Sequence, residues 1–241
     1  MVYFNQPDKH RIRLTNLLKT KDNMLNTTTD ERGNVFHETA IVSKQAQIGF
    51  YNYFGAYCVI HENAIIGDKN YFSSHCSIGS APEHKVALES GNPFFNVNIG
   101  NNNRFNEFTT ISAGAFRETK IGKGNFILRG CYIAHDCILG DSNTISCNVL
   151  IGGHSEIEDN CNLGLGSILH QFSYMGEGAM LGMGAIVPKQ TKLTPYNIYV
   201  GNPVKHLKIN EYLIKKLQIN NEYIFAIQSR YNRRFSEMFF T

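Results

Sequence analysis

An apolar residue recurs at every sixth position through most of the chain, and this period constrains the fold more than any other feature. The register covers three stretches, 42–78, 99–111 and 121–187. Helices repeat every 3.6 residues and strands every 2, so neither element alone explains the pattern. A second, mostly small residue stands two positions before each apolar one. One large and one small inward residue per unit predict an all-β solenoid, in which three units form one triangular coil of 18 residues.

The cysteines follow the same register. Five of the six occupy the small inward position, namely Cys58, Cys76, Cys131, Cys137 and Cys161. Free cysteine behaves as a small buried hydrophobe, and a chain without a signal peptide is expected to keep its thiols reduced. The cysteines are therefore predicted to be structural rather than catalytic.

The 18-residue coil also predicts which distant residues are neighbours. Counting in units from Ile133 places on one face Val42, Ile60, Ile78, Ile111, Ile133, Ile151, Leu169 and Val187. The repeat is interrupted twice, at about 79–96 and 112–118, and both interruptions fall at the corner that follows this face. Residues 134–136, 152–154 and 170–172 follow on the same corner, which we call the histidine edge because it carries His135, His154 and His170.

The histidine edge carries groups that could take part in catalysis. A free imidazole titrates near neutral pH, so His135 is a candidate general base, with Asp136 beside it as a partner. The amide of Gly153, one coil further on, could stabilise an oxyanion. A surface histidine at a turn is usually only a tolerated polar residue, and it is the column of such groups that favours a function here.

Three motifs on this edge resemble those of a known family. They are IAHDC (133–137), GGHSEIED (152–159) and LHQF (169–172), and with the repeat they resemble the UDP-N-acetylglucosamine acyltransferase branch of the hexapeptide-repeat acyltransferases over roughly residues 35–203. The resemblance implies a left-handed parallel β-helix, with active sites between the prisms of a homotrimer. It also implies that His135 is the general base, Asp136 its partner and Gly153 the oxyanion donor. The residues expected to bind substrate or donor are Glu83, His84, Lys85, Tyr132, His154, His170, Gln171 and Asn202.

Some positions depart from the family pattern. Tyr132 stands where the lipid A enzymes have a second histidine, and no RRGF-like signature follows Gly201. The segment VGNPVKHLK (200–208) is instead similar to the GNPAK segment of CoA-dependent sugar acetyltransferases. These departures favour an acyltransferase of cell-surface glycan biosynthesis that moves an acyl group from acyl-CoA to a nucleotide-linked amino sugar. The alternative is the UDP-N-acetylglucosamine O-acyltransferase of lipid A synthesis, which uses acyl-ACP, an acylated acyl carrier protein.

Two other functions are possible for a chain of this fold. The same fold hosts zinc-dependent γ-type carbonic anhydrases, but no two histidines here have their five-residue spacing, so no metal site is predicted. A non-catalytic scaffold would not need the column on the histidine edge. No tightly bound cofactor is expected, because the acyl donor is a co-substrate.

The rest of the chain gives the domain organisation. Residues 1–34 are read as an N-terminal extension with a short helix near 10–20, residues 35–200 as the β-helix, and residues 201–241 as a short α-helical C-terminal region. The basic side chains there could receive an acidic carrier protein: Lys215, Lys216, Arg230, Arg233 and Arg234. The formal charge of +3 is dispersed, which argues against a nucleic-acid partner. Without a signal peptide or an apolar window of transmembrane length, a cytoplasmic protein is expected.

Overall fold

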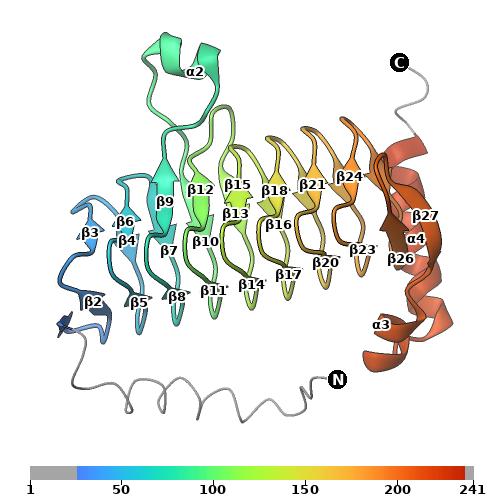
Figure 1. Cartoon of the computed structure of the whole chain (residues 1–241), viewed down its shortest axis with the longest axis horizontal. Coiled ribbons are helices and arrows are strands. Elements are labelled where there is room, and N and C mark those ends of the chain that lie inside the picture. The colour runs from blue at the N-terminus through green and yellow to red at the C-terminus, as the bar shows by residue number, and fades with distance from the viewer. Residues whose placement is uncertain (1–25, 237–241) are drawn as a thin grey trace.

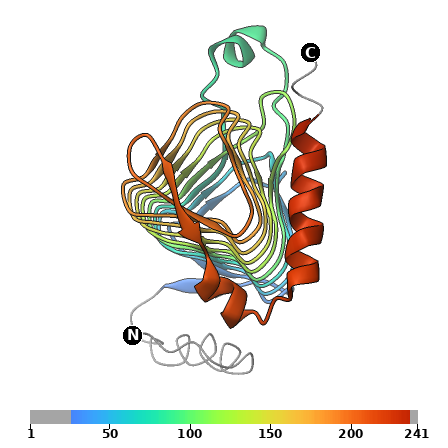
Figure 2. The same cartoon turned by 90° about the vertical axis from the view of Figure 1, so that its right-hand side faces the viewer.

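The computed structural model describes residues 26–236 and shows a left-handed parallel β-helix of triangular cross-section (Figures 1 and 2). The strands of successive coils pair in parallel, as Ile133 of one coil does with Ile151 of the next. The predicted solenoid and its 18-residue coil are therefore confirmed. The helix expected near 10–20 lies outside the described residues.

Three sheets form the faces of the prism. The first sheet is the face predicted from Ile133, with β3 (Ile41–Val42), β6 (Val59–Ile60), β9 (Ser77–Ser80), β12 (Thr110–Ser112), β15 (Tyr132–Ile133), β18 (Leu150–Ile151), β21 (Ile168–Leu169) and β24 (Ile186–Val187). The second sheet follows it across the histidine edge, with β4 (Gln47–Ile48), β7 (Ala64–Ile66), β10 (Val97–Ile99), β13 (Thr119–Ile121), β16 (Ile138–Leu139), β19 (Glu156–Ile157), β22 (Tyr174–Met175) and β25 (Lys192–Leu193).

The third sheet closes the triangle and extends further at both ends. It contains β1 (Thr27–Thr29), β2 (Val35–His37), β5 (Tyr53–Phe54), β8 (Tyr71–Phe72), β11 (Arg104–Phe105), β14 (Phe126–Ile127), β17 (Thr144–Ile145), β20 (Asn162–Leu163), β23 (Met180–Leu181), β26 (Asn197–Val200) and β27 (Lys205–Ile209). Its two outermost strands are antiparallel to their neighbours, β1 to β2 and β27 to β26.

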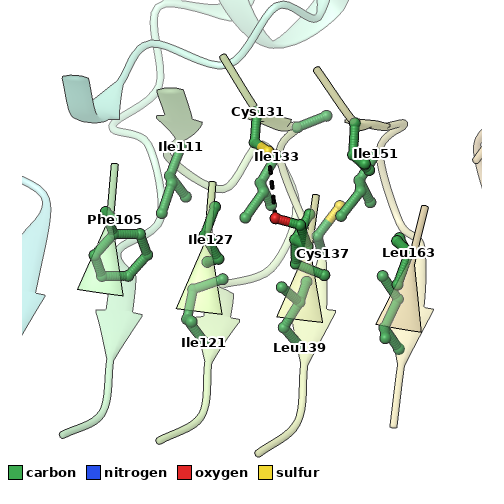
Figure 3. Close-up of a cluster of buried hydrophobic side chains, with 14 of the residues drawn as sticks. Phe105, Ile111, Ile121, Ile127, Cys131, Ile133, Cys137, Leu139, Ile151 and Leu163 are labelled. Atoms are coloured by element: carbon green, nitrogen blue, oxygen red, sulfur yellow. Dashed lines mark hydrogen bonds between the residues drawn. The ribbon is translucent and has the colours of Figure 1, made fainter. Parts of the chain in front are cut away.

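Equivalent inward side chains stack into columns through the prism (Figure 3). The rings of Phe54, Phe72 and Phe105 lie parallel, with centroids 5.1 and 4.8 Å apart. The five inward cysteines are buried and free, as predicted. Burial raises the pKa of Cys131 to about 11 and that of Cys137 to about 12, so these thiols stay protonated at neutral pH.

A second column consists of six buried asparagines. The side-chain oxygen of each accepts the backbone amide at the same position one coil later, and the members are Asn34, Asn52, Asn70, Asn103, Asn125 and Asn143. The column ends where Cys161 takes the next position and donates its amide to Asn143. Among the described residues Asn143 Nδ2 has no hydrogen-bond partner.

Both interruptions of the repeat form loops on the histidine edge. The loop after β9 carries α2 (Lys85–Ser90), which projects from the prism in Figure 1. The loop after β12 leads into β13, and its Gly114 exchanges backbone hydrogen bonds with Phe95 at the end of the first loop. The two insertions therefore support each other beside the next coil, which contains His135.

The C-terminal region closes one end of the prism. After β27 come α3 (Glu211–Lys216) and α4 (Asn221–Ser236), and α4 stands against one face (Figure 2). Arg230 pairs with Glu158 at 3.0 Å, and Arg234 pairs with Glu156. These two arginines therefore hold α4 on the prism, although the sequence suggested a carrier protein as their partner. Within residues 26–236 no helix combines the length and apolar character needed to cross a membrane.

Candidate active site

His135 and Asp136 form a hydrogen-bonded pair at the turn between β15 and β16. His135 Nδ1 lies 2.6 Å from Asp136 Oδ2, and both side chains are almost completely buried. The contact uses Nδ1, so a neutral His135 that donates to the carboxylate keeps Nε2 as a proton acceptor. The pair thus has the arrangement of a general base and the acid that orients it.

The second loop holds Asp136 in place. Asp136 Oδ1 accepts the backbone amides of Ala115, Phe116 and Arg117 at 3.0, 2.9 and 2.8 Å. The amide of Asp136 donates to Thr119 Oγ1, and its φ of 62° lies in the left-handed region. Burial alone would raise the pKa of this carboxyl, but hydrogen bonds from His135 and from the loop amides outweigh it and hold the pKa at about 2. Asp136 is therefore an anion at neutral pH.

Gly153 lies directly over the imidazole of His135. A Cβ atom on Gly153 would fall 2.7 Å from Cε1 and 2.9 Å from Nε2 of that ring. Gly153 is buried, and its amide donates to no acceptor within residues 26–236. An unused amide next to a proposed base is the donor that an oxyanion requires.

His154 approaches the same carboxylate from the next coil. Its Nε2 lies 3.4 Å from Asp136 Oδ2, and its ring stacks on Phe172 at 4.5 Å and on Phe116 at 5.9 Å. Burial lowers the pKa of His154 and outweighs the attraction of Asp136, while His135, Arg117 and His84 add to the lowering. His154 is therefore predominantly neutral at pH 7.

The first loop brings His84 and Glu83 to the site. The His84 ring meets that of His135 edge-on at 5.3 Å, and its Nδ1 accepts the amide of Ala87 as the N-cap of α2. Glu83 accepts a 3.2 Å hydrogen bond from the Tyr132 hydroxyl. Lys85 points away, because its ammonium is exposed and pairs with Glu89 on its own helix.

The remaining predicted residues lie further along the prism. His170 and Gln171 are exposed on the histidine edge, where His170 Nδ1 accepts the amide of Gln171 at 2.7 Å. Asn202 lies in the exposed turn between β26 and β27, whose backbone pairs with Ile186 of β24. Strand β24 is three strands beyond β15 in the first sheet, so the structure does not bring Asn202 to His135 within one chain.

A cavity of about 390 Å³ opens beside His154, between the second loop and the end of α4. Its walls include aromatic rings, among them Phe116 and Phe235. Among residues 26–236, its cationic side chains are Arg117, Lys192 and Arg234, and its carboxylate is that of Glu156. This lining suits an anionic group attached to an apolar or planar part.

Three potential metal ligands also meet at this site. Ligand atoms of His135, Asp136 and His154 lie within 4.8 Å of one another. Two ligands of one zinc ion stand about 3.3 Å apart, given tetrahedral bonds of about 2.0 Å. The 2.6 Å contact between His135 and Asp136 is shorter and is the length of a charge-assisted hydrogen bond. The geometry therefore fits a catalytic pair better than a metal site.

The sequence did not identify the residues that hold Asp136. The amides of Ala115, Phe116 and Arg117 act through the backbone, so their side chains give no signal of this role. The only signal was the position of the second interruption, which falls one coil before His135 on the same edge.

Comparison with known proteins agrees with the repeat. Residues 118–153 match the family model described as bacterial transferase hexapeptide (six repeats). The chain is a hexapeptide-repeat protein. Among solved structures, this hexapeptide-repeat chain is similar to LpxA from Acinetobacter baumannii, with a TM-score of 0.67, 26% identity and coverage of 82% of this chain and 83% of the other. It is also similar to the UDP-N-acetylglucosamine O-acyltransferase (LpxA) from Moraxella catarrhalis, with a TM-score of 0.61, 27% identity and the same coverage.

Curated relatives carry the name acyl-(acyl-carrier-protein)–UDP-N-acetylglucosamine O-acyltransferase. One from Herminiimonas arsenicoxydans is 34% identical over 64% of this chain and 58% of its own length. One from Thiobacillus denitrificans is 30% identical over 67% of this chain and 62% of its own length. The chain thus spans about three fifths of the length of the curated relatives it matches. The resemblance to the UDP-N-acetylglucosamine acyltransferase branch, drawn above from three motifs, agrees with these findings.

Proposed function

We propose that this chain transfers an acyl group from a thioester to a nucleotide-linked amino sugar, with His135 as the general base. The observation that carries the proposal is the 2.6 Å contact between His135 and the buried Asp136, beneath the unused amide of Gly153. The names of the relatives favour UDP-N-acetylglucosamine as the acceptor and its hydroxyl as the attacked group.

The proposed reaction uses each group once. His135 Nε2 takes the proton of the sugar hydroxyl while the oxygen attacks the thioester carbonyl. The negative charge that develops on the carbonyl oxygen is stabilised by the amide of Gly153. The tetrahedral intermediate then collapses, the thiolate leaves, and the proton returns from His135 to the sulfur. Because both substrates meet in one site, no covalent acyl-enzyme is needed.

Acyl carrier protein replaces acyl-CoA as the favoured donor. The segment at 200–208 suggested CoA, but the relatives named above carry acyl carrier protein in their names. Of the basic side chains expected to face a carrier protein, Lys215, Lys216 and Arg233 are exposed and form no described ion pair, so they are the ones we propose for that contact. We also propose that the chain forms a homotrimer, because the resemblance to the UDP-N-acetylglucosamine acyltransferase branch implies one.

The test measures thiol release from acyl carrier protein and from CoA thioesters, with UDP-N-acetylglucosamine as the acceptor. The variant His135→Ala should lower turnover about 1000-fold. His75→Ala is the matched control, because His75 is an exposed histidine of the same prism that stacks between Tyr57 and Phe108 at another corner. It should keep turnover within about twofold, since it lies outside the proposed chemistry.

Wild-type turnover by His135→Ala at saturating substrate would overturn the assignment of the base. A higher kcat/KM with acyl-CoA than with the acylated carrier protein would show that acyl-CoA is the preferred donor. That result would not affect the proposed role of His135.

A further inference from the structure

Three charged side chains connect helix α4 to the backbone of Asp136, the residue whose carboxylate contacts His135. The Arg117 side chain donates from Nε to the carbonyl of Asp136 at 2.9 Å and from its guanidinium to Glu156 Oε1 at 3.2 Å. The other oxygen of Glu156 binds Arg234 of α4. Glu156 thus gives one oxygen to each arginine.

Both ends of this chain of contacts are fixed. Arg117 is also one of the three residues whose amides bind Asp136 Oδ1, so its side chain and its backbone hold the same residue. At the other end, the Arg234 guanidinium lies over the ring of Tyr174 at 4.8 Å, and that ring meets Phe235 edge-on. Glu156 itself belongs to β19, which pairs with β16 directly after the His135 turn.

We propose that Arg234, Glu156 and Arg117 are positioning residues, through which the docked helix α4 holds the second loop and Asp136 in the arrangement that orients His135. Within residues 26–236, none of the three forms a hydrogen bond or ion pair with His135. If Arg234 is removed, Glu156 can turn toward solvent and Arg117 loses its fixed partner. The loop amides then hold Asp136 less firmly, and the base is less well oriented.

A matched pair of variants separates positioning from simple helix docking. Arg230 also anchors α4 to the prism, through Glu158 at 3.0 Å and Glu177 at 3.6 Å. Neither carboxylate contacts the second loop in the part of the chain that the structure describes. Arg234→Met and Arg230→Met therefore each remove one guanidinium from the same helix, but only Arg234→Met breaks the link to Arg117.

Hydrogen–deuterium exchange of the full chain is the first readout, because it does not depend on any activity. In Arg234→Met, amides of the peptide covering residues 112–118 should exchange about tenfold faster, an effect within the range known for coupling through packed contacts. In Arg230→Met their exchange should match wild type. Equal exchange in the two variants would overturn the proposal.

Kinetics give the second readout, which rests on the proposed acyl transfer. Arg234→Met should lower kcat about tenfold, because misplacement of a catalytic group by a fraction of an ångström has costs of this order, while KM stays within about twofold. Arg234→Lys, which can still reach Glu156, should restore most of the rate, and Arg117→Met with Arg234→Met should lose no more than Arg117→Met alone. Additive losses would refute the link. If wild type shows no acyl transfer, the proposed function fails, and the exchange result still decides this inference.

Discussion

An ideal Cβ atom on Gly153 lies 2.7 Å from Cε1 of His135, closer than two carbon atoms can approach without one of them moving. Gly153→Ala should therefore push the imidazole away from Asp136, and we expect activity to fall about 100-fold or more. The measurement is kcat for acyl transfer, with the melting temperature as a check that the β-helix persists. Normal kcat in a folded Gly153→Ala protein would contradict the proposed site.

The anion of Asp136 should contribute to stability in a defined pH range. Its pKa is about 2 in the folded protein against 3.8 for the free group, so the folded state favours the ionised form. This contribution is complete above the unfolded pKa and disappears as the pH falls from about 4 to about 2. Chemical unfolding of wild type and Asp136→Asn should thus show a difference in unfolding free energy that shrinks as the pH falls below 4. A difference that does not change down to pH 2.5 would show that the folded state does not favour the ionised form of Asp136.

Only one cysteine should react readily with a thiol reagent in the native state. Cys147 is half-buried, whereas the five inward cysteines are buried in the prism. A thiol-counting assay should find about one fast equivalent per chain, and five more on denaturation. Cys147→Ser should remove the fast phase. Fast labelling of Cys137, next to the proposed catalytic pair, would show that the coil around His135 opens.

The asparagine column gives a graded test of stability. Asn125 accepts the amide of Asn143 and donates to Asn103 and to the carbonyl of Gly140. Asn143 accepts the amide of Cys161, but its own Nδ2 has no partner among the described residues. Asn125→Ala should cost about 2 kcal/mol of unfolding free energy and Asn143→Ala about 1, because the first leaves more buried polar groups unpaired. The two variants must be compared at one protein concentration, since association would change both values. Equal costs would mean that the unpaired Nδ2 of Asn143 finds a partner in solution.

The fold could be predicted because the inward positions of a β-helix repeat with one fixed period. Counting from Ile133 assigned all eight members of the first sheet, from Val42 to Val187. It also placed both insertions at the corner that carries His135. The repeat fixes backbone register, and register alone decides which residues become neighbours across coils.

The site was only partly predictable. The sequence suggested His135, Asp136 and Gly153, and the structure brings these three together. It could not show that Lys85 turns to solvent, because the conformation of an inserted loop does not follow the repeat. Nor could it show that Arg234 binds Glu156, since that contact joins residues 78 positions apart through helix docking. Contacts made by backbone amides, such as those on Asp136 Oδ1, leave no mark in residue type.

The coils of a solenoid contact only their immediate neighbours, so groups on consecutive coils can form a site within one short block of the chain. The amides on Asp136, the His135 pair and the Gly153 amide come from the turns of three consecutive coils, after β12, β15 and β18. Such a block could in principle be excised and spliced into another prism of the same coil length without redesigning its hydrophobic interior. Evolution could equally have duplicated or deleted coils at the N-terminal end without disturbing it, whereas coils added before α4 would move Arg234 away from Glu156. The length of the prism on its N-terminal side is therefore free to vary independently of the chemistry, whereas its length on the C-terminal side is tied to the position of α4.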